Sequence, residues 1–316
     1  MSSDKPIGWY RTPLEKEVLH KLTERSDIRG FIQSSGFLGV MVLTGTLVAR
    51  SAALHPWFVT VALLVLHGTV CAFCVNAMHE LSHTTVFKNK TLNGFFLYLF
   101  SFIGWINPVV FKASHMKHHQ FTLHPPRDLE VLPETYPSVR SFIASIIDPL
   151  GFFKLVRATF RHALGRMNSS WEESLFPTVE SRRRVARWAR ILLGGHLIIL
   201  TASLASGWWM IPVVVSLTPL YGRWLQFLCN ETQHTGLPGN VPDWRICARS
   251  IKVNPAIGFL YWQMQYHIEH HMYASVPCYN LHRLSRKIRH DLPSRAGLIR
   301  TWMSIRRDPS KTSLVQ

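Results

Sequence analysis

The chain is 316 residues long, enough for one large domain, and only 17% of its residues are charged, against roughly 25% in soluble domains. Its formal net charge is +17, but all except two of its 35 lysines and arginines fall into three regions that flank long apolar stretches. No basic and aromatic stripe stands apart from those stretches, so the sequence argues against a soluble protein and against a nucleic-acid-binding one.

Residues 1–30 are mostly polar and contain one short amphipathic pattern, over 14–22, which predicts a surface helix. No short apolar segment with a small-residue cleavage site follows the start of the chain, so we expect no cleaved signal peptide.

Two long apolar stretches dominate the rest of the chain. Residues 31–78 contain one basic residue, Arg50, and no aspartate or glutamate, and residues 191–229 are interrupted only by Arg223. Each stretch can supply two segments near the roughly 20 residues that cross the hydrocarbon core of a bilayer. The sequence therefore predicts two helical hairpins with four transmembrane helices, in an all-α integral membrane protein.

The basic residues predict the orientation of these hairpins. The three basic regions, residues 1–30, 79–190 and 230–316, all fall on one side of two hairpins. An excess of lysine and arginine marks the cytoplasmic side of a membrane protein. We therefore expect one membrane-bound domain over 1–316, in a bacterial inner membrane or its equivalent, with both termini and the middle region in the cytoplasm.

The middle region contains a third apolar run, residues 91–111, which could span the bilayer by length alone. A full crossing would leave the histidines on either side of it roughly 30 Å apart, on opposite membrane faces. Asn107 and Pro108 break its helical end, so we expect a re-entrant or interfacial hairpin. Residues 148–167 carry apolar and basic side chains on opposite faces, which predicts an interfacial helix or, alternatively, a helix packed on the cap.

Three short motifs, HELSH, HMKHH and HIEHH, hold eight of the 17 histidines. Spacings of three and four residues put the imidazoles of each motif on one face of a helix. Neutral imidazole is a good ligand for iron, copper, zinc and nickel. The predicted metal ligands are His79, His83, His115, His118, His119, His267, His270 and His271.

A further pair, Asn230 and His234, stands one helical turn apart where the fourth predicted span ends. His234 adds a ninth imidazole, and the Asn230 amide is predicted to bind metal directly or through a water. The alternative is a polar cluster at a helix end. Nine nitrogen ligands exceed the coordination of one metal ion, so the sequence predicts two ions, each with an open position.

These motifs resemble those of the membrane fatty acid desaturase family, over roughly residues 75–284. The segment HMKHHQFTLHPPRD is similar to the second histidine box of that family, and HIEHHMYASVPCYNLHRL, with Pro277, Tyr279 and Leu281, is similar to the third. The resemblance implies a non-haem di-iron centre bound by nine histidines, with dioxygen as co-substrate and a lipid or other hydrophobic substrate.

The wider superfamily includes acyl-lipid desaturases, hydroxylases, carotenoid ketolases and enzymes of small polar metabolites, all with boxes of this kind. We expect desaturation of an acyl chain, with hydroxylation or ketolation of a lipid or terpenoid next, and desaturation of a small polar metabolite after that. The acyl-coenzyme A desaturases have one more residue between the first two histidines than this chain has between His79 and His83. Their substrate is therefore not carried over.

The source of electrons and a non-enzymatic alternative also follow from the sequence. The HPGG haem motif of a fused cytochrome b5 domain is absent from the sequence, so the resemblance implies a separate donor: a ferredoxin, a rubredoxin or cytochrome b5 with its reductase. The remote alternative is a metal transporter or sensor, which would need polar groups spread through its spans.

Four acids near the motifs are predicted to hydrogen-bond to ligand imidazoles and fix their orientation. His124 is not expected to be a ligand. His67 and His196 lie inside predicted spans, where we expect lone imidazoles that bond to backbone carbonyls. The four acids are Glu80, Glu231, Glu269 and Asp128.

Overall fold

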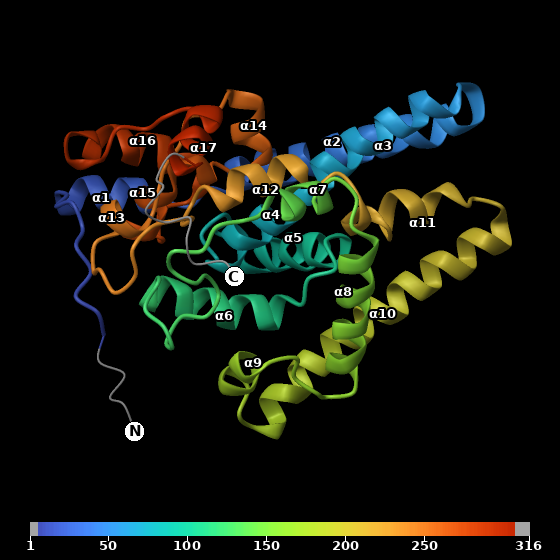
Figure 1. The fold of residues 1–316 in the computed structure, drawn as a ribbon, viewed down its shortest axis with the longest axis horizontal. Helices are drawn as coiled ribbons and strands as arrows, with labels where there is room; N and C mark the ends of the chain where they lie inside the picture. The colour runs from blue at the N-terminus through green and yellow to red at the C-terminus, as the bar shows by residue number, and fades with distance from the viewer. Residues whose placement is uncertain (1–5, 307–316) are drawn as a thin grey trace.

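The computed structural model describes residues 6–306, which are helical and contain no β-strand. Figure 1 shows α2 (Asp27–Leu54) and α3 (Trp57–Ala72) side by side, projecting from one side of the molecule. Helices α10 (Val179–Ser206) and α11 (Met210–Val215) project on the same side, and the short helices near the two ends of the chain gather opposite. The predicted all-α class is confirmed for the described residues.

Three segments are long and apolar enough to cross a membrane: α2, α10, and α3 with α4 (Cys74–Ser82) taken together as Trp57–Ser82. The Ser26 side chain caps the first turn of α2, and a capping box that begins at Thr178 starts α10. Pro56 stands between α2 and α3, and its ring is compatible with the start of a helix but not with its interior. These segments support an integral membrane protein.

The second half of the predicted hairpin over 191–229 is not one helix. After α10 the chain forms α11, the 3-10 helix η1 (Thr218–Leu220) and α12 (Trp224–Glu231). Pro219 removes a backbone donor, and Gly222 has a φ of +79°, which ends the helical path. In the described residues the return leg is thus a broken segment rather than the expected fourth continuous helix.

A further apolar segment of the described residues is a bent pair of helices. Helices α5 (Lys90–Ile103) and α6 (Pro108–Phe121) meet at an angle of 105°. The Asn107 side chain accepts from the amide of Val109 and so caps α6, and Pro108 occupies its first turn. The break lies where the sequence predicted the apolar run over 91–111 to turn, and it lets α6 pack against α4.

Helix α8 (Pro149–Ala163) corresponds to the amphipathic segment predicted over 148–167, and it packs along α10. Its Phe153 and Phe160 remain exposed, whereas Ala163 is buried. An exposed apolar edge on such a helix suits the surface of a membrane. The helices α7 (Val139–Ala144) and α9 (Ser170–Leu175) precede and follow it.

The remaining short helices form a cap around the ends of α4 and α6. Its core contains large buried side chains, among them Tyr261, Trp262 and Trp244. The cap helices are α1 (Lys16–Thr23), α13 (Trp244–Cys247), α14 (Pro255–Leu260), η2 (Met264–Tyr266), α15 (His267–Met272), α16 (Cys278–Ile288), η3 (Arg289–Asp291) and α17 (Leu298–Arg306).

The two lone histidines of the predicted spans behave as expected. His67 Nε2 lies 2.8 Å from the carbonyl oxygen of Val214, and His196 Nε2 lies 3.1 Å from that of Phe102. His67 thereby links α3 to α11, and His196 links α10 to α5. The prediction that they bond to backbone carbonyls is confirmed.

Candidate metal centre

Four separate segments bring the predicted histidines to one point in the cap. The first motif ends α4, the second lies on α6, and the third forms α15, while His234 follows α12. The 105° bend between α5 and α6 turns the second motif back toward the first. All nine imidazoles predicted from the sequence are therefore close together.

The nine histidines divide into two groups, in each of which one nitrogen atom per residue lies within 4.8 Å of the others. The imidazoles of His119 and His271, one from each group, are stacked with ring centroids 4.3 Å apart. The two groups are thus neighbours, and each can hold a metal ion. One group contains His79, His83, His115, His119 and His270; the other contains His118, His234, His267 and His271.

The Nε2 atoms point inward in both groups. In the group of five, His79 Nε2 and His270 Nε2 are 2.8 Å apart, and His119 Nε2 lies 3.2 Å from His270 Nε2. In the group of four, His267 Nε2 lies 2.9 Å from His234 Nε2 and 3.0 Å from His271 Nε2. At these distances, two facing Nε2 atoms cannot both carry a proton.

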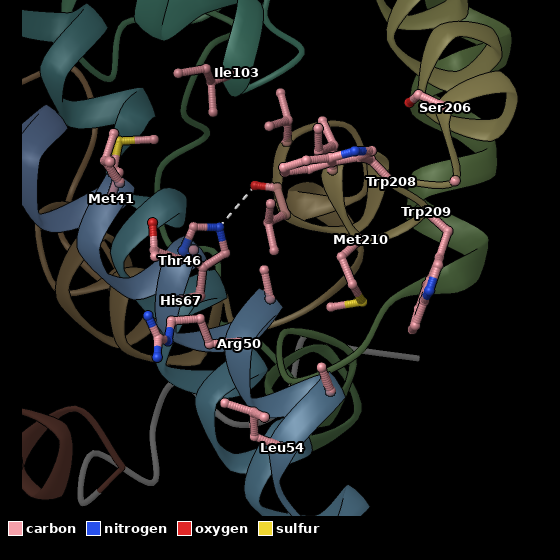
Figure 2. Close-up of a pocket in the computed structure, with 18 of the residues that line it drawn as sticks. Met41, Thr46, Arg50, Leu54, His67, Ile103, Ser206, Trp208, Trp209 and Met210 are labelled. Atoms are coloured by element: carbon pink, nitrogen blue, oxygen red, sulfur yellow. Dashed lines mark hydrogen bonds between the residues drawn. The ribbon is translucent and has the colours of Figure 1, made fainter.

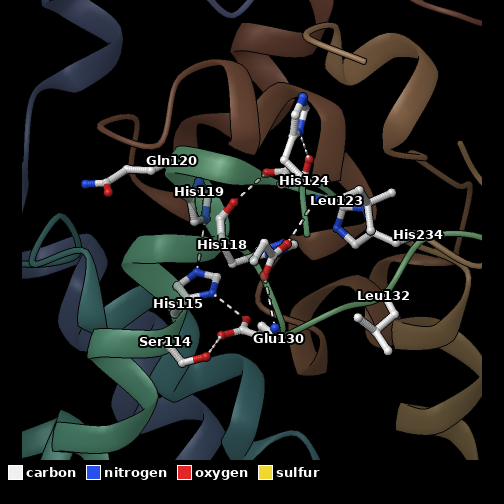
Figure 3. A network of polar contacts seen from close by, with 12 residues as sticks. Ser114, His115, His118, His119, Gln120, Leu123, His124, Glu130, Leu132 and His234 are labelled. Carbon is white, nitrogen blue, oxygen red and sulfur yellow. Dashed lines mark hydrogen bonds and ion pairs between the residues drawn. The ribbon is translucent and has the colours of Figure 1, made fainter. Parts of the chain in front are cut away.

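The outward Nδ1 atoms face acceptors (Figure 3). His118 Nδ1 lies 2.9 Å from Asp128 Oδ2, and His115 Nδ1 lies 3.1 Å from Glu130 Oε1. His234 Nδ1 lies 2.8 Å from the carbonyl oxygen of Cys247. Carboxylates and carbonyls only accept hydrogen bonds, so these Nδ1 atoms carry the proton and each Nε2 keeps its lone pair.

Shifts in pKa favour the neutral form at eight of the nine histidines. The exception is His118: burial lowers its pKa, but the hydrogen bond with Asp128 raises it overall. Burial lowers the pKa of His234 to about 3, and burial together with the neighbouring His267 holds the pKa of His271 well below its ordinary value. Neutral imidazoles with converging lone pairs repel one another unless a cation lies between them. The donor set therefore fits a pair of metal ions, and nitrogen-rich sets of this kind suit iron, copper, nickel or zinc.

The predicted acids differ in what they contact. Asp128 is fully buried and also accepts from the amides of Leu123 and Glu130. Glu80 Oε1 lies 3.1 Å from His270 Nδ1, and Glu80 Oε2 accepts from the amide of Cys278. Asp128 thus hydrogen-bonds to an imidazole, whereas the Glu80 carboxylate lies close to one without a hydrogen bond to it.

Two other acids and the predicted amide ligand are turned elsewhere. Glu269 is buried and accepts from the Ser250 hydroxyl at 2.6 Å. Asn230 accepts from Asn76 Nδ2 at 3.0 Å, and it lines a cavity together with Glu231. Among the described residues no hydrogen bond joins these three side chains to an imidazole.

Glu130 was not among the residues predicted from the sequence. Its Oε1 faces His115, and its Oε2 accepts from the Ser114 hydroxyl at 2.6 Å (Figure 3). A lone acid in the loop after the second motif carries no spacing signal. The contact between Glu130 and His115 depends on the fold of the 122–130 loop, in which Asp128 accepts from the amides of Leu123 and Glu130.

Two cavities are lined in part by residues of the candidate membrane helices. The larger, of about 780 Å³, is bounded by α2, α3 and α11, and His67 and Trp208 face it (Figure 2). The smaller, of about 330 Å³, is lined by Val75, which precedes His79 by one turn of α4. Two consecutive residues line the two cavities: Ile103 the larger and Gly104 the smaller.

The fold and the site together indicate an integral membrane protein with two neighbouring groups of histidines, each of which could hold a metal ion. Residues 54–302 match the sequence profile of the fatty acid desaturase family. The match covers most of the chain, so the chain belongs to this family, as the motifs predicted. No curated protein shows a significant match to the chain. The family implies an oxidoreductase for lipid oxidation of the desaturase or hydroxylase type.

Proposed function

We propose that the chain is an oxygen-dependent di-iron desaturase that forms a C=C bond in an acyl chain. The observation that carries this proposal is the convergence of nine imidazole nitrogens into two adjacent groups of five and four. Two iron ions bound there would supply the activation of dioxygen and the removal of hydrogen from an unactivated carbon, which no side chain can perform. Two hydrogens from the substrate and two external electrons, with two protons, reduce one dioxygen to two waters.

The side chains of this protein have three tasks in that proposal. Asp128 and Glu130 accept the Nδ1 protons of His118 and His115 and so fix the direction of the Nε2 lone pairs, and the Glu80 carboxylate lies 3.1 Å from His270 Nδ1. The burial of the histidines excludes water, which would otherwise intercept the reaction. The cavities would hold the substrate chain with the reacting carbon near His79.

The larger cavity supports an apolar substrate. Its wall consists mainly of aliphatic side chains of α2 and α11, with Trp208 and Trp209 at the far end. An acyl chain that extends from there through the smaller cavity would reach the α4 face that carries His79. The polar residues Asn230, Glu231 and Arg223 line only the smaller cavity, next to the histidines.

Filling the larger cavity is expected to shorten the chain that the enzyme accepts. Ala49 lines this cavity from α2, so Ala49→Phe should lower kcat/KM for a long acyl chain by about tenfold or more for each methylene that no longer fits. Shorter chains should be affected less. The measurement is a chain-length series with iron content determined in parallel. Leu43→Phe, at an exposed position of the same helix outside the cavity lining, is the matched control. Equal losses for all chain lengths would contradict the placement of the chain.

Mass spectrometry of the product tests the reaction type. Loss of two hydrogen atoms from an acyl substrate is the expected result, since it means desaturation. Gain of one oxygen atom would replace this proposal with hydroxylation, the second activity that the family includes. The choice depends on how the substrate carbon is held relative to the metal ions.

The orientation and the electron donor complete the proposal. The basic regions 79–190 and 230–316 favour a cytoplasmic cap, with both termini on that side. A separate carrier, such as a ferredoxin, a rubredoxin or cytochrome b5, would supply electrons there. A bacterial inner membrane or an equivalent membrane fits this arrangement.

A further inference from the structure

Two stacked tryptophans connect the surface of the cap with the histidine site. Trp9 is half-buried, and its ring stacks on that of Trp244 with centroids 4.4 Å apart and planes 7° apart. Trp244 is 1% exposed, and its ring centroid lies 6.0 Å from that of His271, a member of the group of four. Among the described residues, Trp244 is the one tryptophan in ring contact with a histidine of either group.

A hydrogen-bonded path runs beside the ring contact. Trp244 Nε1 donates to Thr122 Oγ1 at 3.3 Å, and the same hydroxyl lies 3.4 Å from His271 Nδ1. Thr122 Oγ1 also donates to the carbonyl oxygen of His118 at 2.6 Å. One hydroxyl thus joins the buried tryptophan to two residues of the group of four.

The N-terminal segment is held in place over this path. Tyr10 pairs with Asp243 in a parallel bridge, and Trp9 Nε1 donates to the carbonyl oxygen of Gln120 at 2.9 Å. His124 packs edge-on against the Trp9 ring at 5.3 Å. A segment more than one hundred residues away in sequence therefore adds one aromatic ring at the surface of the site.

The charges around Trp9 are mainly positive. The Arg11 guanidinium lies 5.7 Å from the Trp244 ring, and Lys117 and Arg127 lie over Phe121, next to Gln120. The nearby acids Asp243 and Asp291 are both bound to Arg245, and Asp291 also accepts from the Tyr10 hydroxyl. A partner with an acidic face would fit this surface, because opposite charges speed and orient docking.

We infer that Trp9 and Trp244 form the route by which an acidic one-electron carrier, with an iron–sulfur or haem centre, reduces the metal site. This inference rests on the proposed function. In each transfer the carrier's centre loses one electron and a ferric ion in the site gains it, while the tryptophans are unchanged. Electron transfer weakens steeply with the gap between donor and acceptor, and stacked rings shorten the gaps through otherwise insulating protein.

Anaerobic stopped-flow absorbance of the iron-loaded protein tests the route, with reduced ferredoxin, rubredoxin and cytochrome b5 as probes. Trp9→Leu should slow reduction by the most effective carrier several-fold, and Trp9→Phe, which keeps a stacked ring, should slow it less. Trp302→Leu is the matched control, because Trp302 is half-buried in the cap and donates to the carbonyl of Leu228, away from the histidines. Equal rates in wild type and Trp9→Leu would overturn the inference.

Chemical reduction separates this inference from the proposed function. Reduced by dithionite and then given dioxygen and substrate, Trp9→Leu should form product at the wild-type rate. A loss there, or a loss of iron, would show that Trp9 only holds the cap together. If the dithionite-reduced wild type forms no product, the proposed function fails instead. If none of the three carriers reduces a wild type that dithionite does reduce, the route for an acidic carrier is contradicted.

Binding provides a readout that does not depend on turnover. Arg11→Glu should weaken binding of the carrier to the ferric protein by about tenfold, because like charges then face each other. Arg183→Glu, at an exposed cation in α10, is the control for total charge. Equal weakening by both variants would contradict docking over Trp9.

Discussion

His270→Ala is expected to leave the protein with less than its full metal content and without turnover. His270 Nε2 is 2.8 Å from His79 Nε2 and 3.2 Å from His119 Nε2, so it faces the middle of the group of five. Its removal also leaves the buried Glu80 carboxylate without the imidazole beside it. Metal analysis of purified protein, with a product assay, checks the result. His118→Ala should have the same effect through the group of four.

Two histidines outside the groups serve as controls for this experiment. His55 lies at the turn between α2 and α3, and His55→Ala should keep metal and activity. His162 is buried like the site residues but pairs with Glu172 at 2.8 Å, so His162→Gln tests the loss of a buried imidazole as such. Full activity in His270→Ala would refute its assignment as a ligand.

Asp128→Asn is expected to weaken metal binding by about 10- to 100-fold, the usual effect of losing a partner of a ligand imidazole. Asp128 Oδ2 accepts from His118 Nδ1 and from the amide of Leu123, and Oδ1 accepts from the amide of Glu130. Asparagine keeps only one acceptor oxygen, so its NH₂ group would face a donor in place of the other. The measurement is metal content against free metal concentration, alongside kcat.

Glu172→Gln is the matched control for Asp128→Asn, because it changes another buried histidine–carboxylate pair that lies outside the site. Unchanged metal affinity in Asp128→Asn, or an equal loss in Glu172→Gln, would contradict an orienting role for Asp128. Comparison of His118→Ala with Asp128→Asn separates the loss of a ligand from the loss of the carboxylate that orients it.

The histidine site was largely predictable because its information is local. Spacings of three and four on short helices bring the imidazoles of each motif to one face, and the nine predicted histidines do lie together. The turn of the apolar run over 91–111 was predictable too, since Asn107 and Pro108 are strong signals for a helix start.

The rest depends on contacts that spacing does not encode. Periodicity and hydropathy could not tell that the segment after α11 breaks at Pro219 and Gly222, because apolar composition is the same in a helix and in a broken segment. Asn230 as a ligand stays a prediction; its carbonyl accepts from Asn76, a contact that its spacing from His234 does not encode. The Trp9 and Trp244 pair joins distant segments, so no local pattern could predict it.

The structure also bears on the transporter alternative. A pathway for metal ions would need polar groups along the spans that are able to exchange partners. The intramembrane His67 and His196 are instead bonded to backbone carbonyls and to the hydroxyls of Thr44 and Ser216. The nine clustered histidines lie near the ends of α4, α6 and α12 and in α15, as a cluster rather than as a path along the spans.

Iron quantitation combined with oxygen uptake tests the central claim most directly. The purified protein, supplied with a reducing system and an acyl substrate, should contain two iron ions per chain, one for each histidine group, and should consume oxygen only when substrate is present. Metal transport without oxygen consumption, or a site that retains only zinc and no activity after iron loading, would contradict it.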